Sequence, residues 1–277
     1  MDCEIIYQVF NKFPEIFKDT FNKCLDLGVF PSSWKKGKLI VLKKNTGSKV
    51  ITPSNLRLIT LINTFAKLFE KALLKRLSWH SERNHWLNAN QFGFRKGRST
   101  ETSLINIKNS IATCFTNKEF CALIAIDISK AFDSAWWDGL FASLRKSGCP
   151  KNLLALIIDY FKERFVEIEI DEEKFYNKLS RGCPQGSSLS PFFWNIFFNP
   201  IFDISLPSTA KTYGYADDLV LLVKGSSIEE MERDIKISLQ KITLWCTNNF
   251  LNINASKTKV CLFSNHHLLP SISINLH

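Results

Sequence analysis

The sequence predicts an α+β fold built around a mostly antiparallel sheet. Apolar stretches rich in β-branched and aromatic residues have the length of strands, at residues 37–44, 120–129, 212–225 and 258–264. Segments with helical periodicity separate them, without the regular strand–helix–strand alternation of a doubly wound sheet. The length of 277 residues and the apolar content of 45% suit one large domain or two closely packed lobes.

The N-terminal part is expected to combine helices with a strand. The first thirty residues are predicted to be helical, ending near Gly28 and Pro31, and the strand at 37–44 is followed by a loop at 45–55. A long amphipathic helix is expected from Asn63 to Arg83. Its apolar face is predicted to consist of Phe65, Leu68, Phe69, Ala72, Leu73 and Leu77. A basic loop, "NQFGFRKGRST" at 90–100, leads into another helix.

The remaining elements follow the strand "FCALIAIDIS", which ends in an acid. Helices near 138–147 and 151–164 precede a hairpin that turns at Asp171–Glu173. Ser190 is expected to cap the next helix, with Pro191 at its first position. Two strands joined by a turn at 212–225, a helix at 227–248 and the strand at 258–264 complete the prediction.

The net charge is strongly basic. Lys and Arg number 36 against 26 Asp and Glu, which gives a formal charge of +10. Such an excess suits a partner that carries repeated negative charge, and nucleic acid is the first candidate. A basic solvated surface gives the same composition, so charge alone leaves both interpretations open.

Cysteine usage and hydropathy bear on the compartment. The eight Cys form no CxxC pair and have no His at metal-ligand spacing, which favours a reduced intracellular protein, nuclear or cytoplasmic. Residues 182–202 carry no charge, but Pro184, Pro191 and Pro200 interrupt them. We therefore predict no membrane role.

Three acids in apolar surroundings are the first chemical signal. Asp217 and Asp218 lie side by side in "TYGYADDLVLLVKG", and Asp127 ends "ALIAID". Two carboxylates about 4 Å apart repel each other by about 4 kcal/mol at an effective dielectric of about 20. Converging acids therefore need a cation, and oxygen ligands without His or Cys favour Mg²⁺. A solvated hairpin tip is the alternative for the adjacent pair, and Asp127 at a second strand end weighs against it.

These segments resemble the motifs of reverse transcriptases, in the same order along the chain. "AIDISKAFD" and "YADD" resemble the two metal-binding motifs, and "RGCPQGSSLSPFFWN" between them resembles the nucleotide-pocket motif. Upstream, "FPSSWKKGKLIVLKK", "NLRLITLINTFAKLFEKALLKRL" and "NQFGFRKGRST" are similar to the fingers motifs of non-LTR, LINE-type retrotransposons, especially the jockey-like group. "LNINASKTKV" resembles the motif after the catalytic hairpin, so the resemblance covers residues 27–264.

The resemblance implies a catalytic set. Asp127 and Asp217 would hold two Mg²⁺ ions, for which Mn²⁺ could substitute, with help from the backbone carbonyl of Ile128. Asp218 would complete the acidic cluster, and Lys257 would protonate the departing pyrophosphate. A solvated surface lysine is the alternative for Lys257. Asp133 matches the family pattern but is expected to be structural.

The resemblance also implies residues that bind the incoming deoxynucleotide. Lys43 and Arg57 match positions that hold the β- and γ-phosphates. Gln185 and Gly186 would lie beside the deoxyribose and the template base, and Phe132 would act as a steric gate against a 2′-hydroxyl. The simpler interpretations are surface cations for the first pair, a plain loop for the second and a core position for Phe132.

A single-stranded template is expected to contact the basic loop at 90–100. Cations for the phosphates and aromatic faces for the bases are the usual means of holding a single strand. The candidates here are Phe92, Phe94, Arg95, Lys96 and Arg98. A buried Phe pair with exposed cations is the alternative.

The resemblance implies the fingers and palm of a right-hand polymerase, with fingers roughly at 30–120 and 165–180 and palm roughly at 121–164 and 181–265. The predicted function is that of an RNA-directed DNA polymerase, with an RNA template, a DNA primer and dNTP as partners. No thumb is expected after the last strand and no endonuclease before the domain, and the usual Tyr and Pro around Arg57 are Leu56 and Leu58. These departures keep open a catalytically impaired, nucleic-acid-binding fragment. An RNA-templated RNA polymerase is disfavoured by Phe132.

Overall fold

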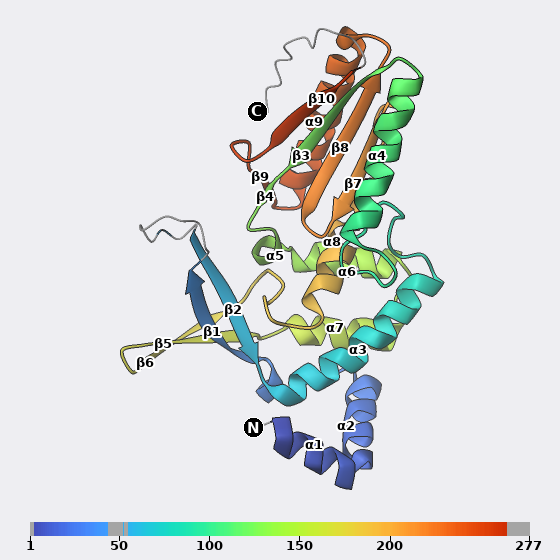
Figure 1. Ribbon diagram of the computed structural model, residues 1–277. Coiled ribbons are helices and arrows are strands. Elements are labelled where there is room, and N and C mark those ends of the chain that lie inside the picture. Colours follow the sequence, from blue (N-terminus) through green and yellow to red (C-terminus); the bar gives the residue numbers. More distant parts are fainter. Residues whose placement is uncertain (1–2, 44–51, 53–54, 265–277) are drawn as a thin grey trace. The chain divides into compact units, whose positions relative to one another are not determined.

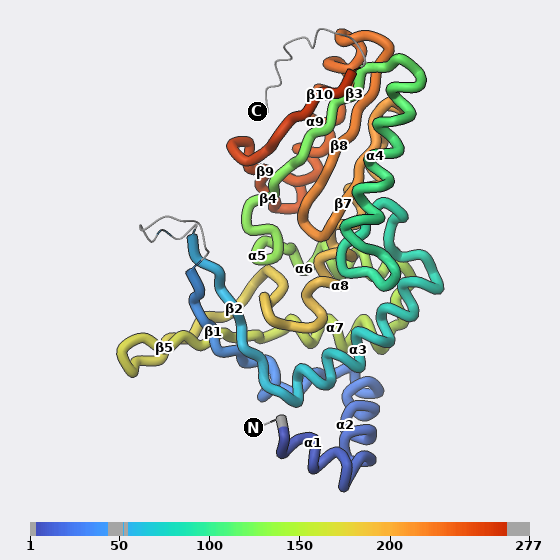
Figure 2. Tube along the Cα trace, viewed as in Figure 1, coloured from blue at the N-terminus to red at the C-terminus, as the bar shows by residue number. Residues whose placement is uncertain are grey.

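The computed structural model describes residues 3–43, 52 and 55–264, and Figures 1 and 2 follow the course of the chain. The chain divides into two compact units. Unit 1 comprises Met1–Trp86 and Trp137–Phe193, and unit 2 comprises Leu87–Trp136 and Trp194–His277. Most of the loop predicted at 45–55 lies outside the described residues.

Helices make up most of unit 1. They are α1 (Cys3–Lys12), α2 (Pro14–Leu27), α3 (Thr64–Arg83), α6 (Trp137–Lys146) and α7 (Lys151–Phe161). The predicted N-terminal helical region is confirmed, and it is divided between Lys12 and Pro14, where the proline occupies the start of α2. Gly28 ends α2 in the left-handed conformation, as the sequence predicted.

A mixed four-stranded sheet completes unit 1. Its strands lie in the order β2 (Leu56–Ile62), β1 (Lys36–Lys43), β5 (Phe165–Ile170) and β6 (Glu173–Lys178), with β1 antiparallel to β2 and parallel to β5. The predicted hairpin is confirmed, and its turn residues Asp171 and Glu172 both have positive φ, as a two-residue hairpin turn requires. β2 was not among the strands predicted from the sequence.

Aromatic rings fill the core of unit 1. Phe30 packs against Phe69 of α3 at 5.6 Å between ring centroids and against Tyr160 of α7 at 5.0 Å. The buried face of α3 differs in part from the prediction, because Leu68 and Ala72 are exposed. The buried residues are Ala66, Phe69, Glu70, Leu73, Leu77 and Ser81. The buried face of α3 is therefore rotated relative to the predicted apolar face, and it includes the carboxylate of Glu70.

Glu70 is the buried acid of this face. Its carboxylate accepts hydrogen bonds from the Ser187 hydroxyl at 2.8 Å, the Ser188 backbone N–H at 2.8 Å and the Tyr160 hydroxyl at 3.0 Å. Burial raises the pKa of Glu70, and the hydrogen bonds from Ser187 and Ser188 oppose that rise. The acid therefore fixes the loop that follows Gln185 onto α3.

We expect Glu70→Leu to lower the free energy of unfolding by about 3 kcal/mol or more, because each buried donor left without a partner costs about 1–3 kcal/mol. Urea denaturation measures the change. Lys71→Leu, on the exposed part of the same helix, is the control and should change stability by less than about 0.5 kcal/mol. Equal effects of the two substitutions would contradict the role given to Glu70.

Unit 2 is built on an antiparallel sheet. The strand order is β10 (Lys259–Phe263), β3 (Phe120–Ile126), β8 (Asp218–Gly225) and β7 (Ala210–Tyr215). A short second pair joins β4 (Ile128–Ser129) to β9 (Asn252–Ile253). The predicted α+β fold class and its antiparallel sheet are confirmed.

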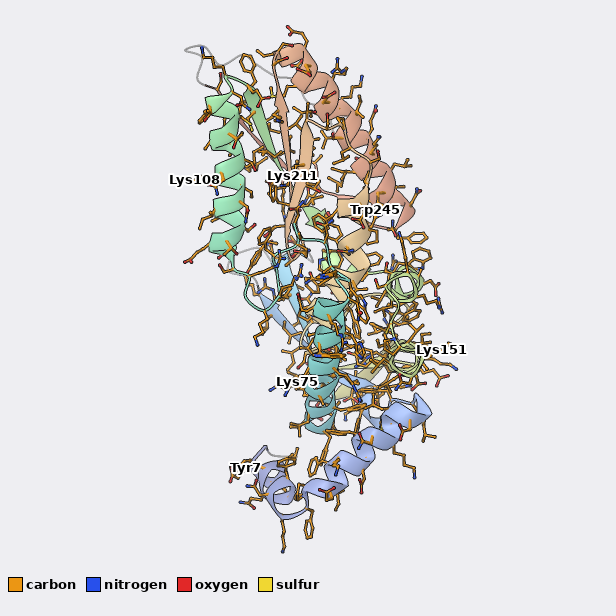
Figure 3. The ribbon with its side chains drawn as sticks, turned by 90° about the vertical axis from the view of Figure 1, so that its right-hand side faces the viewer. Tyr7, Lys75, Lys108, Lys151, Lys211 and Trp245 are labelled. Atoms are coloured by element: carbon orange, nitrogen blue, oxygen red, sulfur yellow. The ribbon has the colours of Figure 1, made fainter. Side chains whose placement is uncertain are left out.

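Helices cover both faces of the antiparallel sheet. Figure 3 shows α4 (Thr100–Thr116), with Lys108 labelled, and α9 (Ile228–Asn248), with Trp245 labelled, on opposite sides of the strands. Ile107 and Cys114 of α4 pack with Cys121 and Leu222 in one core layer. Because side chains alternate along a strand, Ala122, Ile124, Leu221 and Val223 face the α9 side. The strands are thus buried on both faces, which explains their nearly continuous apolar sequence.

The shorter helical segments of the described chain are the 3₁₀ turn Ser32–Trp34, α5 (Ala131–Ser134), α8 (Ser190–Phe198) and the 3₁₀ turn Asn199–Asp203. α8 begins in unit 1 and ends in unit 2. Ser190 does not cap α8 as predicted. It is the first helical residue, and its hydroxyl donates to the Pro184 carbonyl at 2.7 Å. Among the described residues, no helix is long and apolar enough to cross a membrane.

Candidate active site

The three predicted acids lie at one end of the antiparallel sheet of unit 2. β3 stops at Ile126, and Asp127 follows it directly, while Asp217 lies in the β7–β8 turn and Asp218 starts β8. The last registered pair of β3 and β8 is Ile126 with Leu219, so the next position of that register sets Asp127 against Asp218. Opposed residues of antiparallel strands are about 4.5–5.5 Å apart. The fold thus brings together acids that are about ninety residues apart in the sequence.

The acids affect one another electrostatically. Burial raises the pKa of Asp217, a hydrogen bond from its own backbone opposes that rise, and the charge of Asp127 adds to it. Burial also raises the pKa of Asp218, and the charges of Asp217 and Asp127 raise it further. Partly desolvated acids that repel one another are stabilised by a cation.

The donor set fits a hard divalent cation. All three side chains offer carboxylate oxygens, which Mg²⁺, Mn²⁺ and Ca²⁺ prefer. Within the described residues, no group of three or more His, Cys, Asp or Glu side chains lies close enough together to hold a metal ion. Mg²⁺ is usually held by one or two carboxylates, with water and substrate phosphates as its other ligands. The site therefore fits an ion whose coordination the substrate completes.

The turn after β9 holds the backbone of Asp127. The Asn254 N–H donates to the Asp127 carbonyl at 2.8 Å, and the Asp127 N–H reaches the Thr258 hydroxyl at 3.4 Å. Ile128 pairs with Ile253 in the short β4–β9 ladder. Lys257 lies on this same turn with its side chain exposed. The predicted motif "LNINASKTKV" thus contacts the strand end that carries Asp127.

Phe132 is half-buried in α5, near the acids in sequence. Its ring stacks on Trp194, with 5.4 Å between centroids and 28° between planes. Phe94 approaches the Phe132 ring edge-on, with centroids 6.2 Å apart. The ring is therefore held in one orientation by two aromatic neighbours.

The basic loop at 90–100 is more ordered internally than the sequence suggested. Phe92 is only 6% exposed and belongs to the core layer with Tyr213, so its ring is not presented to a ligand. The Arg95 guanidinium donates to the carbonyls of Asn88 and Gln91. Arg98 donates to the Ala89 carbonyl and lies over the Phe92 ring. Phe94 is 59% exposed, and Lys96 is also exposed, so these two side chains of the loop lie at the surface.

Gln185 and Gly186 belong to unit 1, where their loop joins β2. The Thr60 N–H donates to the Gln185 carbonyl at 2.7 Å. Gly186 has φ +121°, and a Cβ there would lie 2.4 Å from the Thr60 carbonyl oxygen. Only glycine allows this approach, so the loop is fixed to the strand that carries Arg57.

Lys43 and Arg57 lie on neighbouring strands of unit 1, and both side chains are exposed. Lys43 pairs with Leu56, whereas Arg57 pairs with Leu42. Directly paired side chains share a face and successive ones alternate, so Lys43 and Arg57 point to opposite faces of this strand pair. The described strands therefore do not bring the two predicted phosphate-binding cations together. Leu56 and Leu58 are accommodated within the β2 ladder.

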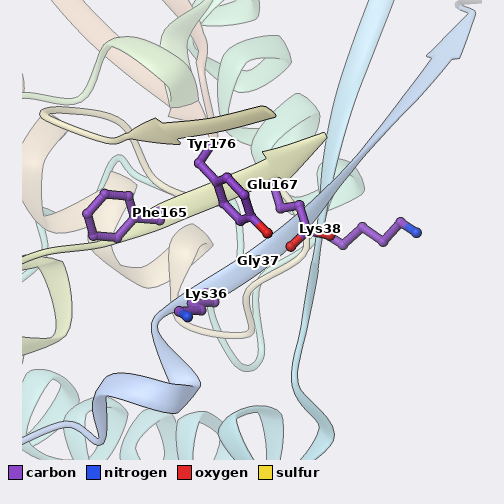
Figure 4. A pocket seen from close by; sticks show the side chains of 6 residues that line it. All are labelled: Lys36, Gly37, Lys38, Phe165, Glu167 and Tyr176. Atoms are coloured by element: carbon purple, nitrogen blue, oxygen red, sulfur yellow. The ribbon is translucent and has the colours of Figure 1, made fainter. Parts of the chain in front are cut away.

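A small hollow of about 110 Å³ lies on the mixed sheet of unit 1 (Figure 4). It is lined by Lys36, Gly37, Lys38, Phe165, Glu167 and Tyr176. None of the predicted site residues lines it.

Comparisons with known proteins identify the family. The family described as "Reverse transcriptase (RNA-dependent DNA polymerase)" matches residues 41–271, most of the chain. The chain belongs to the reverse transcriptase family. The jockey-like resemblance seen in the motifs is confirmed, and members of this family generally use divalent metal ions.

Retrotransposon proteins are among its sequence relatives. This chain is 29% identical over 244 residues to the "Probable RNA-directed DNA polymerase from transposon BS" of Drosophila melanogaster, covering 86% of this chain and 27% of that protein. It is 28% identical over 263 residues to the "RNA-directed DNA polymerase from mobile element jockey" of the same species, covering 92% and 28%. The chain thus spans about a quarter of the length of these relatives.

Solved telomerase structures share the fold. This chain aligns with apo telomerase from Candida tropicalis, truncated from the C-terminal domain, at a TM-score of 0.60 and 15% identity. The alignment covers 87% of this chain and 52% of the telomerase chain. At this identity the likeness concerns the fold.

Two buried residues that fix the site loops, Glu70 and Gln91, were not among the residues predicted from the sequence. Glu70 holds the loop after Gln185, and Gln91 contacts the backbone of Ala216 in the β7–β8 turn. The only sequence signal was a polar residue inside an apolar helix for Glu70 and a position within "NQFGF" for Gln91. Neither signal indicates the residue that is bound, Ser187 by Glu70 or Ala216 by Gln91.

Because the acids of the cluster repel one another, we expect the thermal stability of the folded chain to depend on divalent ions. An acid whose pKa is raised by folding destabilises the folded state when it ionises, with full effect above the raised pKa and none below the unfolded value of about 3.9. Without divalent ions, Asp217→Asn should therefore raise Tm at pH 7 by about 2 °C, and the gain should shrink as the pH falls toward 4.

With divalent ions present, the wild type should become more stable than Asp217→Asn. An ion at ten times its Kd stabilises the folded chain by about 1.4 kcal/mol, and Asp217→Asn should lose most of this gain. Thermal unfolding with EDTA and with MgCl₂ measures both effects. An equal Mg²⁺-induced shift in the wild type and in Asp217→Asn would contradict a cation site at this cluster.

Proposed function

We propose that this reverse transcriptase domain is an RNA-directed DNA polymerase that adds deoxynucleotides to a primer 3′-hydroxyl on an RNA template. The observation that carries the proposal is the meeting of Asp127 with Asp217 and Asp218 at one end of the antiparallel sheet. The relatives named as RNA-directed DNA polymerases support it.

The reaction joins the primer to the α-phosphate of the incoming dNTP. The 3′-oxygen forms a bond to the α-phosphorus, the bond to the bridging oxygen of the β-phosphate breaks, and pyrophosphate leaves. The 3′-hydroxyl loses its proton, and the pyrophosphate gains one. Asp127 and Asp217, with the backbone carbonyl of Ile128, would hold two Mg²⁺ ions, and Asp218 would add negative charge to their surroundings. Bound there, the ions would activate the 3′-hydroxyl and stabilise the charge that develops on the phosphate.

Lys257 is the candidate donor of the proton that the pyrophosphate gains. Its turn is hydrogen-bonded through Asn254 to the Asp127 carbonyl, which ties it to the acidic cluster. An ammonium group also neutralises a phosphate that is leaving. Manganese is proposed as the alternative ion, because it accepts the same oxygen ligands.

Substrate contacts are proposed for residues of both units. In unit 1, Gln185 and Gly186 would contact the deoxyribose and the template base. Arg57, on the strand to which their loop is bonded, would contact the phosphates. Lys43 points to the opposite face of the strand pair, so it would not contact the same phosphates as Arg57. In unit 2, Phe94 and Lys96 are the exposed members of the loop proposed to contact the RNA template, with Arg95, Arg98 and Phe92 supporting the loop from within. The fingers are proposed at 30–120 and 165–180, and the palm at 121–164 and 181–265.

Primer extension tests the proposed function. The purified chain should incorporate dTMP on poly(rA)/oligo(dT) in the presence of Mg²⁺, and it should not do so without template or with EDTA. Absence of incorporation with Mg²⁺ or Mn²⁺ would overturn the proposed polymerase. Retained binding of the primer–template in that case would favour the nucleic-acid-binding fragment.

Binding should depend steeply on salt. A chain that neutralises several phosphates releases their counterions, so log K should fall linearly with log salt concentration. With about five phosphate contacts, the affinity should fall several hundredfold or more when the salt concentration is raised from about 50 to 200 mM. Fluorescence anisotropy with a labelled primer–template measures the slope. Affinity that does not change with salt would contradict a nucleic-acid partner.

A further inference from the structure

Ala216, the residue before the two adjacent acids, has an unusual backbone conformation. Its φ is +59°, in the left-handed region. For an L-residue other than glycine this conformation costs about 1–2 kcal/mol. It persists where surrounding contacts fix it. Because Asp217 follows directly, the conformation of Ala216 decides where the Asp217 and Asp218 side chains point.

The side chain of Gln91 contacts both polar backbone atoms of Ala216. Its Nε2 donates to the Ala216 carbonyl at 3.2 Å, and its Oε1 accepts from the Ala216 N–H at 3.2 Å. The same Oε1 accepts from the Gly93 N–H at 3.1 Å. Gln91 is fully buried, so water does not compete for these atoms. A primary amide offers a donor and an acceptor side by side, and it can therefore bind both ends of one peptide residue.

Two further contacts fix the same turn. Trp194 donates from its indole Nε1 to the Ala216 carbonyl at 3.1 Å. Gly93 packs so closely that a Cβ there would lie 2.1 Å from the Ala216 nitrogen. The segment 90–92, which precedes Gly93, is hydrogen-bonded to β7. The Phe92 N–H donates to the Gly214 carbonyl at 2.8 Å, and the Gly214 N–H donates to the Asn90 carbonyl at 2.9 Å. The backbone that carries Gln91 and Gly93 is therefore itself hydrogen-bonded to the β7–β8 hairpin.

We propose that Gln91 is a positioning residue that holds Ala216 in its left-handed conformation and so aims Asp217 and Asp218 at the metal ions. The inference rests on the metal site of the proposed function. Trp194 assists through the second hydrogen bond to the Ala216 carbonyl. A residue that only stabilised the core would affect the amount of folded protein and leave the affinity of the folded protein for metal unchanged.

Mn²⁺ binding, followed by electron paramagnetic resonance of the free ion, tests the role of Gln91 without requiring catalysis. Gln91→Met keeps the size of the side chain and removes its three hydrogen bonds. Per folded molecule, it should weaken Mn²⁺ binding by about tenfold. Trp194→Phe removes one hydrogen bond and keeps an aromatic ring, and it should weaken binding by about threefold.

Tyr213→Phe is the matched control. Tyr213 is a buried residue of β7 whose hydroxyl bonds to the Ser110 hydroxyl of α4 at 2.7 Å. Its removal should leave Mn²⁺ affinity at the wild-type value. Circular dichroism and thermal unfolding give the folded fraction of each variant. If Gln91→Met does not fold, Trp194→Phe decides the question by the same measurement.

The outcomes separate the inference from the proposed function. Wild-type Mn²⁺ affinity in a folded Gln91→Met, or in Trp194→Phe where Gln91→Met does not fold, overturns the positioning role. Wild-type binding that Asp217→Asn does not weaken overturns it as well, because the ion would then lie elsewhere. If the wild type binds Mn²⁺ through Asp217 but does not extend a primer, the polymerase proposal fails and the positioning role is still decided by the Mn²⁺ affinities. In an active wild type, Gln91→Met should also raise the half-saturating Mg²⁺ concentration of primer extension.

Discussion

Asp217→Asn is expected to lower the rate of primer extension by about a thousandfold or more. The substitution keeps the shape of the side chain and removes one negative charge from the proposed metal site. Metal ions stabilise the transition state of phosphoryl transfer by several kcal/mol, and each 1.36 kcal/mol corresponds to about tenfold in rate. Asp127→Asn should have an effect of the same order, because Asp127 faces the same cluster from the end of β3.

Asp133→Asn is the control for these two variants. Asp133 is exposed in α5, and the sequence motif that contains Asp127 also contains it. We expect a structural role, and therefore a change in rate of less than about tenfold. Single-turnover extension, with the folded fraction measured in parallel, gives the comparison. Equal rates for Asp217→Asn and an active wild type would contradict the catalytic assignment.

The second large effect concerns the choice of sugar. Phe132→Val is expected to raise ribonucleotide incorporation relative to deoxyribonucleotide by about ten- to a hundredfold, the range that pocket shape usually controls. The ring stacks on Trp194 and is met edge-on by Phe94, so its position is fixed. A fixed ring beneath the sugar would exclude a 2′-hydroxyl by steric clash, which the smaller Val would relieve.

A core position for Phe132 predicts a different outcome. Truncation would then cost stability, and incorporation of both nucleotides would fall together. Phe202→Val is a suitable control, because Phe202 is also half-buried and packs on Phe198 within unit 2. Competition between rNTP and dNTP with each variant measures the ratio. An unchanged ratio in Phe132→Val would reject the steric gate.

Most strands and helices could be predicted because their signals are local. The strands at 120–129 and 258–264 are short apolar runs, and they are close to β3 and β10 of the structure. The helix at 227–248 begins after Ser227, whose hydroxyl accepts from the Glu230 N–H, an N-cap that can be read directly from the sequence. Asp127 was identified as a candidate for the same reason, because an acid that ends an apolar strand is unusual.

The remaining features depend on contacts between distant residues. Gln91 and Ala216 are 125 positions apart, and Glu70 and Ser187 are 117 apart, so no local pattern links them. The sequence left open whether Phe92 contacts bases or is buried, and its packing with Ile107 and Cys114 of α4 shows that it is buried. β2 was missed because its apolar run continues into the helical pattern of α3, where the two periods cannot be separated by inspection.

The most direct test of the central claim is the number of divalent ions that the acidic cluster holds when substrates are bound. The measurement is a Mn²⁺ titration followed by electron paramagnetic resonance, with a dideoxy-terminated primer on an RNA template and the matching dNTP, so that chemistry cannot proceed. A Mn²⁺·dNTP mixture without protein gives the background. We predict that wild type binds about two ions per chain, as a two-metal site requires, and that Asp217→Asn loses them. Equal Mn²⁺ binding by the wild type and by Asp217→Asn would contradict the account.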